Sequence, residues 1–270
     1  DVLGITLMPW QRWLLERMLE LNPDGTFRFR TVLIQVARQN GKSTLAQVLS
    51  LWRMFVDRSP LVIGTAQNLD VAEEVWTGAV EMAEGTPDLL AEIAAVERTN
   101  GKKALRLTGG ERYKVAAASR RGGRGLSGDL VLLDEIREHR TWDAWAAVTK
   151  TTMARRRPQI VALSNAGDAS SVVLNHLRTL GLATLDAGDP SIGFFEWSAP
   201  EGCDLDDRDG WMAANPALGH TITEQSIAAA LATDPEPIFR TEVLCQQVAE
   251  IEPRPIPEAA WVALARNDAI

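Results

Sequence analysis

The chain has 270 residues, of which 46% are hydrophobic and 24% charged, and this is the composition of a globular protein that can bury a sizeable core. No stretch approaches about 18 uninterrupted apolar residues, the length that a membrane span requires, so we expect no membrane partner. The formal net charge of −8 argues against a protein whose whole surface binds nucleic acid.

Helix-like and strand-like segments alternate over the first two thirds of the chain. The predicted helices carry apolar residues at helical spacing and span about residues 9–21, 45–52, 69–83, 142–153 and 171–185. The predicted strands are short apolar runs at 31–36, 61–66, 130–135 and 159–163, with weaker candidates at 103–107 and 113–118. This alternation predicts an α/β fold with a mostly parallel sheet between layers of helices.

The composition changes near residue 187, where Gly188-Asp189-Pro190 interrupts the pattern. A last strand is expected at 192–197, followed by short helices at 209–214, 223–233 and 237–248. We therefore predict a core at residues 1–187 and a small helical subdomain at 188–250. Residues 251–270 begin with a proline-rich linker and are expected to start a truncated further domain, and the N-terminus is expected to be an interior cut of a longer chain.

The segment that links the first core strand to its helix has the composition of a phosphate-binding loop. It reads Ala37-Arg38-Gln39-Asn40-Gly41-Lys42-Ser43-Thr44, and strand, tight loop and helix follow one another as a Walker A motif requires. Backbone N–H groups at a helix N-terminus attract an anion, Lys42 would reach the terminal phosphates, and Ser43 would contact Mg²⁺. The pattern departs from the usual one at Val36, where glycine is expected, and a simple helix start capped by serine is the alternative.

A second apolar strand ends in two carboxylates, Asp134 and Glu135, about 90 residues after the Gly-Lys-Ser sequence. A strand of this kind is buried on both faces, as in a parallel sheet. Asp134 can hold Mg²⁺ through water and Glu135 can orient an attacking water, which are the parts that phosphoryl transfer needs. A buried strand with an acidic turn is the alternative, but the order and spacing of the two motifs favour an ATPase.

An arginine- and glycine-rich loop at 119–128 precedes the acidic strand. Arginines on such a loop, here Arg120, Arg121 and Arg124, can stabilise transition-state charge on a neighbouring subunit's phosphate or contact a nucleic-acid backbone. Together with basic residues at 102–114 and 155–157 they allow one basic face on an acidic body. Solvated charges on separate mobile loops are the alternative.

Two polar segments complete the candidate site. The sequence Ser164-Asn165-Ala166 ends the strand after the acidic one and can contact the γ-phosphate or its water, although a capped strand-to-helix turn fits equally well. Gln11, which follows Trp10 ahead of the first core strand, can pair with adenine through both edges of its amide. A core tryptophan beside a surface glutamine is the alternative.

In this order the segments resemble the ATPase domain of a large terminase subunit, the DNA-packaging motor of tailed bacteriophages. The matching residues are 7–11, 37–43, 64–68, 120–128, 130–135, 163–166, 211 and 215–219, so the resemblance reaches to about residue 248. The Ala-Arg-Gln-Asn-Gly-Lys-Ser form is specific, since these terminases tolerate the missing glycine. The resemblance implies a RecA-like, ASCE-type P-loop ATPase core with a C-terminal lid subdomain after Gly188.

The resemblance also implies roles for individual residues. The residues implied to bind nucleotide are Gln11 at adenine and Arg38, Gln39, Asn40, Gly41, Lys42, Ser43, Thr44 and Asn165 at phosphate. The implied metal ligands are Ser43 and Asp134. Catalysis is expected from Glu135, from the phosphate-sensing Arg38 and from Arg124 donated in trans, with Arg121 as the alternative to Arg124.

The implied activity is Mg²⁺-dependent hydrolysis of ATP that drives double-stranded DNA into a procapsid. The implied partners are further copies of the chain in a ring (a pentamer), the portal protein and the small terminase subunit, in the cytoplasm of the host cell. Full-length members carry a C-terminal nuclease, and we expect no DNA-cleaving site within these 270 residues.

Two other functions fit parts of the pattern. A superfamily-2-type helicase or translocase core shares the glutamine, the phosphate loop and the Asp-Glu pair, but normally has a second RecA-like domain in place of the small helical tail. A non-catalytic nucleotide-binding assembly module would have no need of Lys42, Asp134 and Glu135 together.

Overall fold

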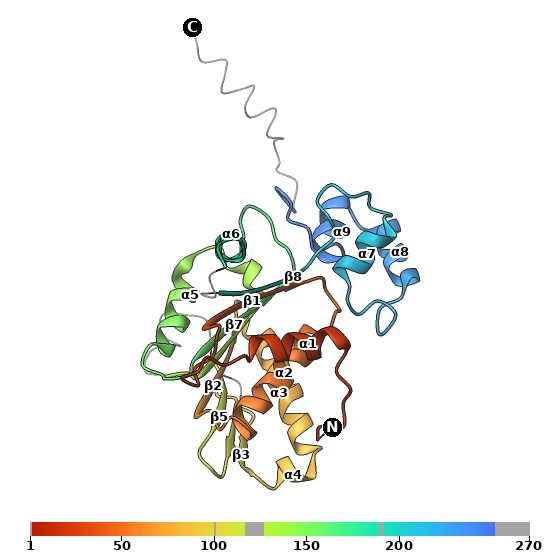
Figure 1. Ribbon diagram of the computed structural model, residues 1–270. Coiled ribbons are helices and arrows are strands. Elements are labelled where there is room, and N and C mark those ends of the chain that lie inside the picture. Colours follow the sequence, from red (N-terminus) through yellow and green to blue (C-terminus); the bar gives the residue numbers. More distant parts are fainter. Residues whose placement is uncertain (1, 100, 117–126, 189–191, 252–270) are drawn as a thin grey trace.

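The computed structural model describes residues 2–99, 101–116, 127–188 and 192–251. Within these ranges the strands form one eight-stranded sheet in the order β3-β4-β5-β2-β6-β7-β1-β8 (Figure 1). The strands from β5 to β8 pair in parallel, and β3 and β4 add an antiparallel edge. The predicted α/β fold with a mostly parallel sheet is therefore confirmed.

The strands are β1 (Thr31–Val36), β2 (Leu61–Ala66), β3 (Ile93–Glu97), β4 (Ala104–Leu107), β5 (Arg112–Val115), β6 (Leu130–Asp134), β7 (Gln159–Ser164) and β8 (Ile192–Trp197). The helices are α1 (Pro9–Met18), α2 (Lys42–Phe55), α3 (Leu69–Glu84), α4 (Pro87–Leu90), α5 (Trp142–Thr149), α6 (Val172–Ala187), α7 (Arg208–Ala214), α8 (Glu224–Thr233) and α9 (Glu236–Glu242). Two 3₁₀ helices, η1 (Ile136–Glu138) and η2 (Lys150–Thr152), flank α5.

The central strands β1, β2, β6 and β7 are buried along nearly their whole length, which explains why each is an uninterrupted apolar run. Strand β7 lies between β1 and β6, with Leu33 opposite Ala162 and Leu133 opposite Ala162 on the other side. The carboxyl ends of these three strands therefore meet at one edge of the sheet, where ligands of open α/β sheets bind.

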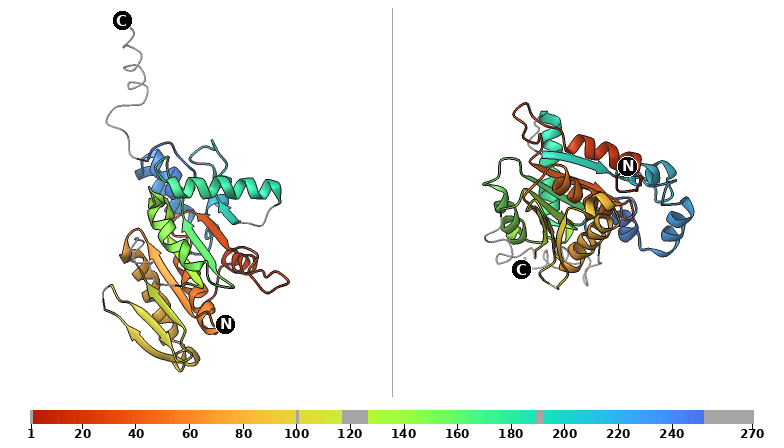
Figure 2. Two further views of the ribbon diagram at one scale, coloured as in Figure 1. Left: turned by 90° about the vertical axis from the view of Figure 1, so that its left-hand side faces the viewer. Right: turned by 90° about the horizontal axis from the view of Figure 1, so that it is seen from below.

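Helices cover both faces of the sheet. The main apolar core joins α1, α2 and α3 to one face, and two smaller clusters join α5 and α6 to the other. Figure 2 shows α2 and α3 on one side and α5 on the opposite side in the view from below. No described helix is both long and apolar enough to cross a membrane.

A small helical subdomain, which we define as residues 198–248 with α7, α8 and α9, lies beside the carboxyl ends of the strands (Figure 1). It has its own apolar cluster, centred on the fully buried Trp211 and Phe239. Strand β8 precedes this subdomain and pairs with β1 over its whole length, so it belongs to the sheet. The domain boundary near residue 187 stays a prediction.

Several predicted bounds shift in the structure. The first helix ends at Met18 because Leu21 pairs with Phe27 in an isolated bridge. The last helix ends at Glu242 rather than near 248, because Cys245 adopts a left-handed conformation with φ of 53°. The edge strand β3 was not predicted, since its side chains are mostly exposed and its apolar residues do not form a buried run.

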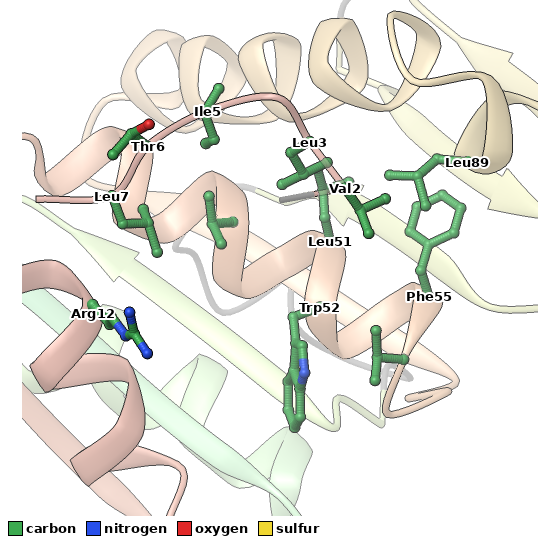
Figure 3. A pocket seen from close by; sticks show the side chains of 12 residues that line it. Val2, Leu3, Ile5, Thr6, Leu7, Arg12, Leu51, Trp52, Phe55 and Leu89 are labelled. Carbon is green, nitrogen blue, oxygen red and sulfur yellow. The ribbon is translucent and has the colours of Figure 1, made fainter.

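The N-terminal segment 2–7 runs along α2 and, with it, lines an open pocket of about 570 Å³ (Figure 3). Its walls are mostly apolar, from Leu3 and Leu7 on one side to Trp52 and Phe55 on the other. None of the residues that the sequence assigned to nucleotide or metal lines this pocket.

Candidate nucleotide site at the carboxyl ends of the strands

The phosphate loop occupies the turn between β1 and α2. Helix α2 begins at Lys42, three residues earlier than predicted, so Lys42, Ser43 and Thr44 form its first turn with their N–H groups free for an anion. Gly41 has a φ of 88°, and a Cβ there would lie 2.7 Å from Gln11 Nε2. Glycine is therefore required at this position for both conformation and space.

Lys42 folds back onto its own loop. Its Nζ donates to the carbonyl oxygens of Val36 at 2.9 Å and Ala37 at 3.0 Å. Desolvation of the ammonium group lowers the pKa of Lys42, while the thiol of Cys245 and nearby carboxylates, including Asp134, act in the opposite direction. Because both carbonyl bonds are inside the loop, an arriving phosphate has to replace them.

Gln11 is buried against the phosphate loop. Its Oε1 accepts from the Met8 N–H at 2.9 Å, and its Nε2 donates to the Gly41 carbonyl at 2.9 Å. The amide thus ties the start of α1 to the loop in this structure. Whether Gln11 also contacts adenine stays a prediction.

The side chain of Asn40 points into the helical subdomain. Its Nδ2 donates to Asn215 Oδ1 at 3.0 Å, and its Oδ1 accepts from the Ala217 N–H at 3.0 Å. Asn40 is completely buried, so only its backbone is left to contact a phosphate. Asn215 in turn donates to the Val243 carbonyl at 2.9 Å, and the pair joins the phosphate loop to the chain after α9.

The two carboxylates at the end of β6 differ in environment. Burial raises the pKa of Asp134, against the effects of the Glu135 N–H, which Asp134 Oδ1 accepts at 2.9 Å, and of Lys42. Glu135 is partly exposed and has a left-handed φ of 52°, an uncommon conformation for a residue other than glycine. This backbone turns the Glu135 side chain toward Arg38, 3.7 Å away, and Arg137, 3.9 Å away.

Ser43 and Asp134 are the two predicted metal ligands. Ser43 is exposed in the first turn of α2, and Asp134 ends β6 beside Lys42. Among the described residues, no group of three or more histidine, cysteine or acidic side chains is placed to hold a metal. One hydroxyl and one carboxylate fit Mg²⁺, which keeps several waters and takes its remaining ligands from phosphates.

Polar groups at the end of β7 reach both neighbours. Ser164 Oγ accepts from the Arg137 N–H at 3.2 Å, and Asn165 Nδ2 donates to Glu242 Oε2 at 2.8 Å. Arg38 of the phosphate loop forms an ion pair with the same carboxylate at 3.2 Å. The segment 164–166 therefore connects the strand ends to the helical subdomain.

Two residues of this network were absent from the sequence prediction. Arg137 follows Glu135 by two positions and lies 2.7 Å from Glu242, the last residue of α9. The position of Arg137 next to the Asp-Glu pair was a usable signal. For Glu242 there was none, because its partners are far away in sequence.

The arginine-rich loop cannot be placed. Arg120, Arg121 and Arg124 lie outside the described residues, and their roles stay predictions. The structure brings the other predicted residues together: the phosphate loop, Asp134, Glu135 and Asn165 line one edge of the sheet, with Gln11 directly behind the loop.

Comparisons with known proteins agree with this arrangement, although no protein-family model matches the chain. The large terminase subunit of Enterobacteria phage HK97 is 30% identical over 247 residues, which are 86% of this chain and 46% of that protein. The crystal structure of the HK97 bacteriophage large terminase has a TM-score of 0.78 at 25% identity and covers 90% of this chain and 51% of the other.

Two further solved structures show the same fold at lower identity. The large terminase ATPase domain of Thermus phage P74-26 has a TM-score of 0.65 at 17% identity and covers 92% of this chain and 96% of the other. The large terminase of a thermophilic bacteriophage in complex with ADP has a TM-score of 0.61 at 10% identity, covering 88% and 53%.

The chain spans about half the length of the curated HK97 relative. The P74-26 structure, in contrast, is an ATPase domain that the chain covers almost completely. The predicted RecA-like fold is confirmed by these neighbours. Sequence and fold together place the chain with the ATPase domains of phage large terminase subunits.

Proposed function

We propose that this chain binds ATP at the edge formed by β1, β6 and β7 and hydrolyses it with Mg²⁺. The observation that carries the proposal is the meeting of two motifs far apart in sequence: Lys42 lies close enough to Asp134 and Glu135 for their charges to affect its pKa. A phosphate-binding lysine opposite a metal-binding and a water-orienting carboxylate is the arrangement of P-loop ATPases. The ADP complex of the thermophilic-phage terminase supports nucleotide binding here.

In this proposal each residue has one task. Lys42 leaves its two loop carbonyls for the phosphates, and Ser43 and Asp134 would hold the magnesium ion. The bound ion supplies positive charge that stabilises the negative charge of the transferring phosphoryl group. Glu135 orients the attacking water, and Arg38 contacts the γ-phosphate from the same loop as Lys42.

We further propose that hydrolysis drives double-stranded DNA into a procapsid, as the match to phage large terminases suggests. The chain would act in a homo-oligomeric ring (a pentamer) with the portal protein and the small terminase subunit, in the cytoplasm of the host cell. Arg124 would complete the site of the neighbouring subunit. A DNA-cleaving activity is not assigned to these 270 residues.

Steady-state ATP hydrolysis as a function of protein concentration tests the proposal, with and without double-stranded DNA. Glu135→Ala should lower the rate by about 10²–10³-fold, because the water loses its orienting group. Glu97→Gln, an exposed carboxylate on the β3 edge, is the control and should leave the rate unchanged. A wild-type rate per subunit that rises with concentration supports the shared site.

Equal rates in wild type and Glu135→Ala would contradict the assignment of Glu135. Binding of ATP without turnover under every condition, including DNA and partners, would instead support the non-catalytic assembly module.

A further inference from the structure

A carboxylate from the helical subdomain lies at the centre of the candidate nucleotide site. Glu242 Oε1 lies 2.7 Å from Arg137 Nη1, and Glu242 Oε2 accepts from Asn165 Nδ2 at 2.8 Å. Arg38 Nε lies 3.2 Å from the same Oε2, and the Arg38 N–H donates to the Glu242 carbonyl at 2.9 Å. The donors come from three segments: the phosphate loop, the residues after β6 and the end of β7.

Local helix preference does not explain this position. Glu242 is the last residue of α9, where a carboxylate faces the negative end of the helix dipole. The side chain is only 17% exposed, and that of Arg137 only 10%. The cationic groups therefore have to offset both the dipole and the loss of hydration, which shows that this part of the site binds an anion strongly.

The groups that hold Glu242 also surround Glu135. Arg38 lies 3.7 Å and Arg137 3.9 Å from the Glu135 carboxylate. In the proposed function, the water that Glu135 orients attacks the γ-phosphate, so this phosphate has to lie in front of Glu135. The γ-phosphate and Glu242 would thus require the same donors.

We propose that Glu242 is an internal competitor of the γ-phosphate of ATP. The inference rests on the proposed function and goes beyond it. In the nucleotide-free protein Glu242 neutralises Arg38, Arg137 and Asn165 and keeps α9 against the phosphate loop. A triphosphate takes over Arg38 and Asn165 and releases α9, whereas a diphosphate lacks the competing group and leaves α9 in place. Helix α9 therefore responds to the presence of the γ-phosphate.

Nucleotide affinities of Glu242→Gln test this competition. Glutamine keeps the shape of the side chain but removes its charge, so the triphosphate no longer has to displace an anion. We expect the variant to bind the non-hydrolysable triphosphate analogue AMP-PNP with Mg²⁺ about tenfold more tightly than wild type, and ADP within about twofold of it. Titration calorimetry with each nucleotide measures both dissociation constants.

Stability should change in the opposite direction. Without nucleotide, Glu242→Gln should have a lower melting temperature than wild type, because Arg137 loses its closest carboxylate in a half-buried site. The melting temperature should nevertheless rise more on addition of AMP-PNP than it does for wild type. A residue that merely holds the fold together would lose stability without gaining triphosphate affinity.

Glu236→Gln is the matched control. Glu236 begins α9 and forms an exposed ion pair with Arg240 at 2.7 Å, away from the phosphate loop, so neither affinity should change. Unchanged or weakened AMP-PNP binding by Glu242→Gln, relative to ADP, would overturn the competition while leaving nucleotide binding by the wild type intact. Wild-type protein that binds neither nucleotide would overturn the proposed function as well.

Hydrogen exchange in the wild type gives an independent readout. The Arg38 N–H is bonded to the Glu242 carbonyl, so its exchange reports directly on the contact with α9. AMP-PNP should accelerate exchange in α9 relative to ADP. Equal protection of α9 with both nucleotides would contradict the release.

Discussion

Two arginine clusters at opposite ends of the sheet show two uses of the same side chain. Arg53 lies at the amino ends of β6 and β7, where it is completely buried. Its guanidinium donates to Ser59, Gln159 and the carbonyls of Asp129 and Arg157, at 2.9–3.3 Å. Every direction of the planar fork is used, and most of the partners are neutral.

The cluster at the carboxyl ends is arranged differently. Arg38 is 55% exposed, and Arg38 and Arg137 share the carboxylates of Glu135 and Glu242 at distances between 2.7 and 3.9 Å. Within the described part of the chain, the backbone offers these two guanidinium groups one acceptor, the Ala166 carbonyl, 3.4 Å from Arg137. The comparison suggests that an arginine saturated by neutral groups stabilises the fold, whereas arginines that share side-chain carboxylates remain available for a ligand.

Removing the saturated arginine should have the largest effect on stability. Arg53→Met keeps an unbranched apolar stem but leaves Asp57, the Asp129 carbonyl and Gln159 without their buried donor. We expect the free energy of unfolding to fall by about 3–5 kcal/mol, with nucleotide affinity unchanged in the folded protein. Urea unfolding followed by circular dichroism measures the loss.

The control for Arg53→Met is Arg98→Met, which removes an exposed arginine paired with Glu84 at 2.7 Å. Surface pairs contribute about 0–1 kcal/mol, so this variant should be nearly as stable as wild type. Similar losses in the two variants would break the distinction between saturated and shared arginines.

The contact between the phosphate loop and the helical subdomain should have an intermediate effect. Asn215→Ala removes the acceptor of Asn40 Nδ2 and the donors to the Trp211 and Val243 carbonyls. The expected loss is about 1–3 kcal/mol, the cost of leaving buried polar groups unpaired. Hydrogen exchange should show the loss as faster exchange in α7 and α9 rather than in the central strands, and uniform acceleration throughout the sheet would argue against a local contact.

The sequence predicted what short segments determine by themselves. Four strands, β1, β2, β6 and β7, are buried runs that no other element resembles, and the Gly-Lys-Ser and Asp-Glu motifs are contiguous. Glu242 could not be predicted, because its partners Arg38 and Arg137 are more than a hundred positions away. The end of α9 depends on the left-handed backbone of Cys245, a tertiary effect that helical periodicity does not contain.

The smallest expected effect concerns pH, and it distinguishes the two ends of the sheet. His139 follows the segment that carries Arg137, is 1% exposed, and has no hydrogen-bond partner for either ring nitrogen among the described residues. Burial lowers the pKa of His139 below its ordinary value of 6.5, whereas burial raises the pKa of Asp129 beside Arg53.

A histidine whose pKa is lower in the folded than in the unfolded state binds its proton more readily when unfolded. Stability should therefore be complete above pH 6.5 and fall as the pH drops from 6.5 through the lowered pKa. His139→Phe, which keeps a buried ring without a titrating group, should flatten this part of the profile. Asp129 has the opposite sign, since its raised pKa makes folding more favourable as the pH falls toward 3.8. Urea midpoints at pH 7, 6 and 5 for wild type and His139→Phe measure the difference, and an identical decline in both would assign the acid sensitivity to other groups.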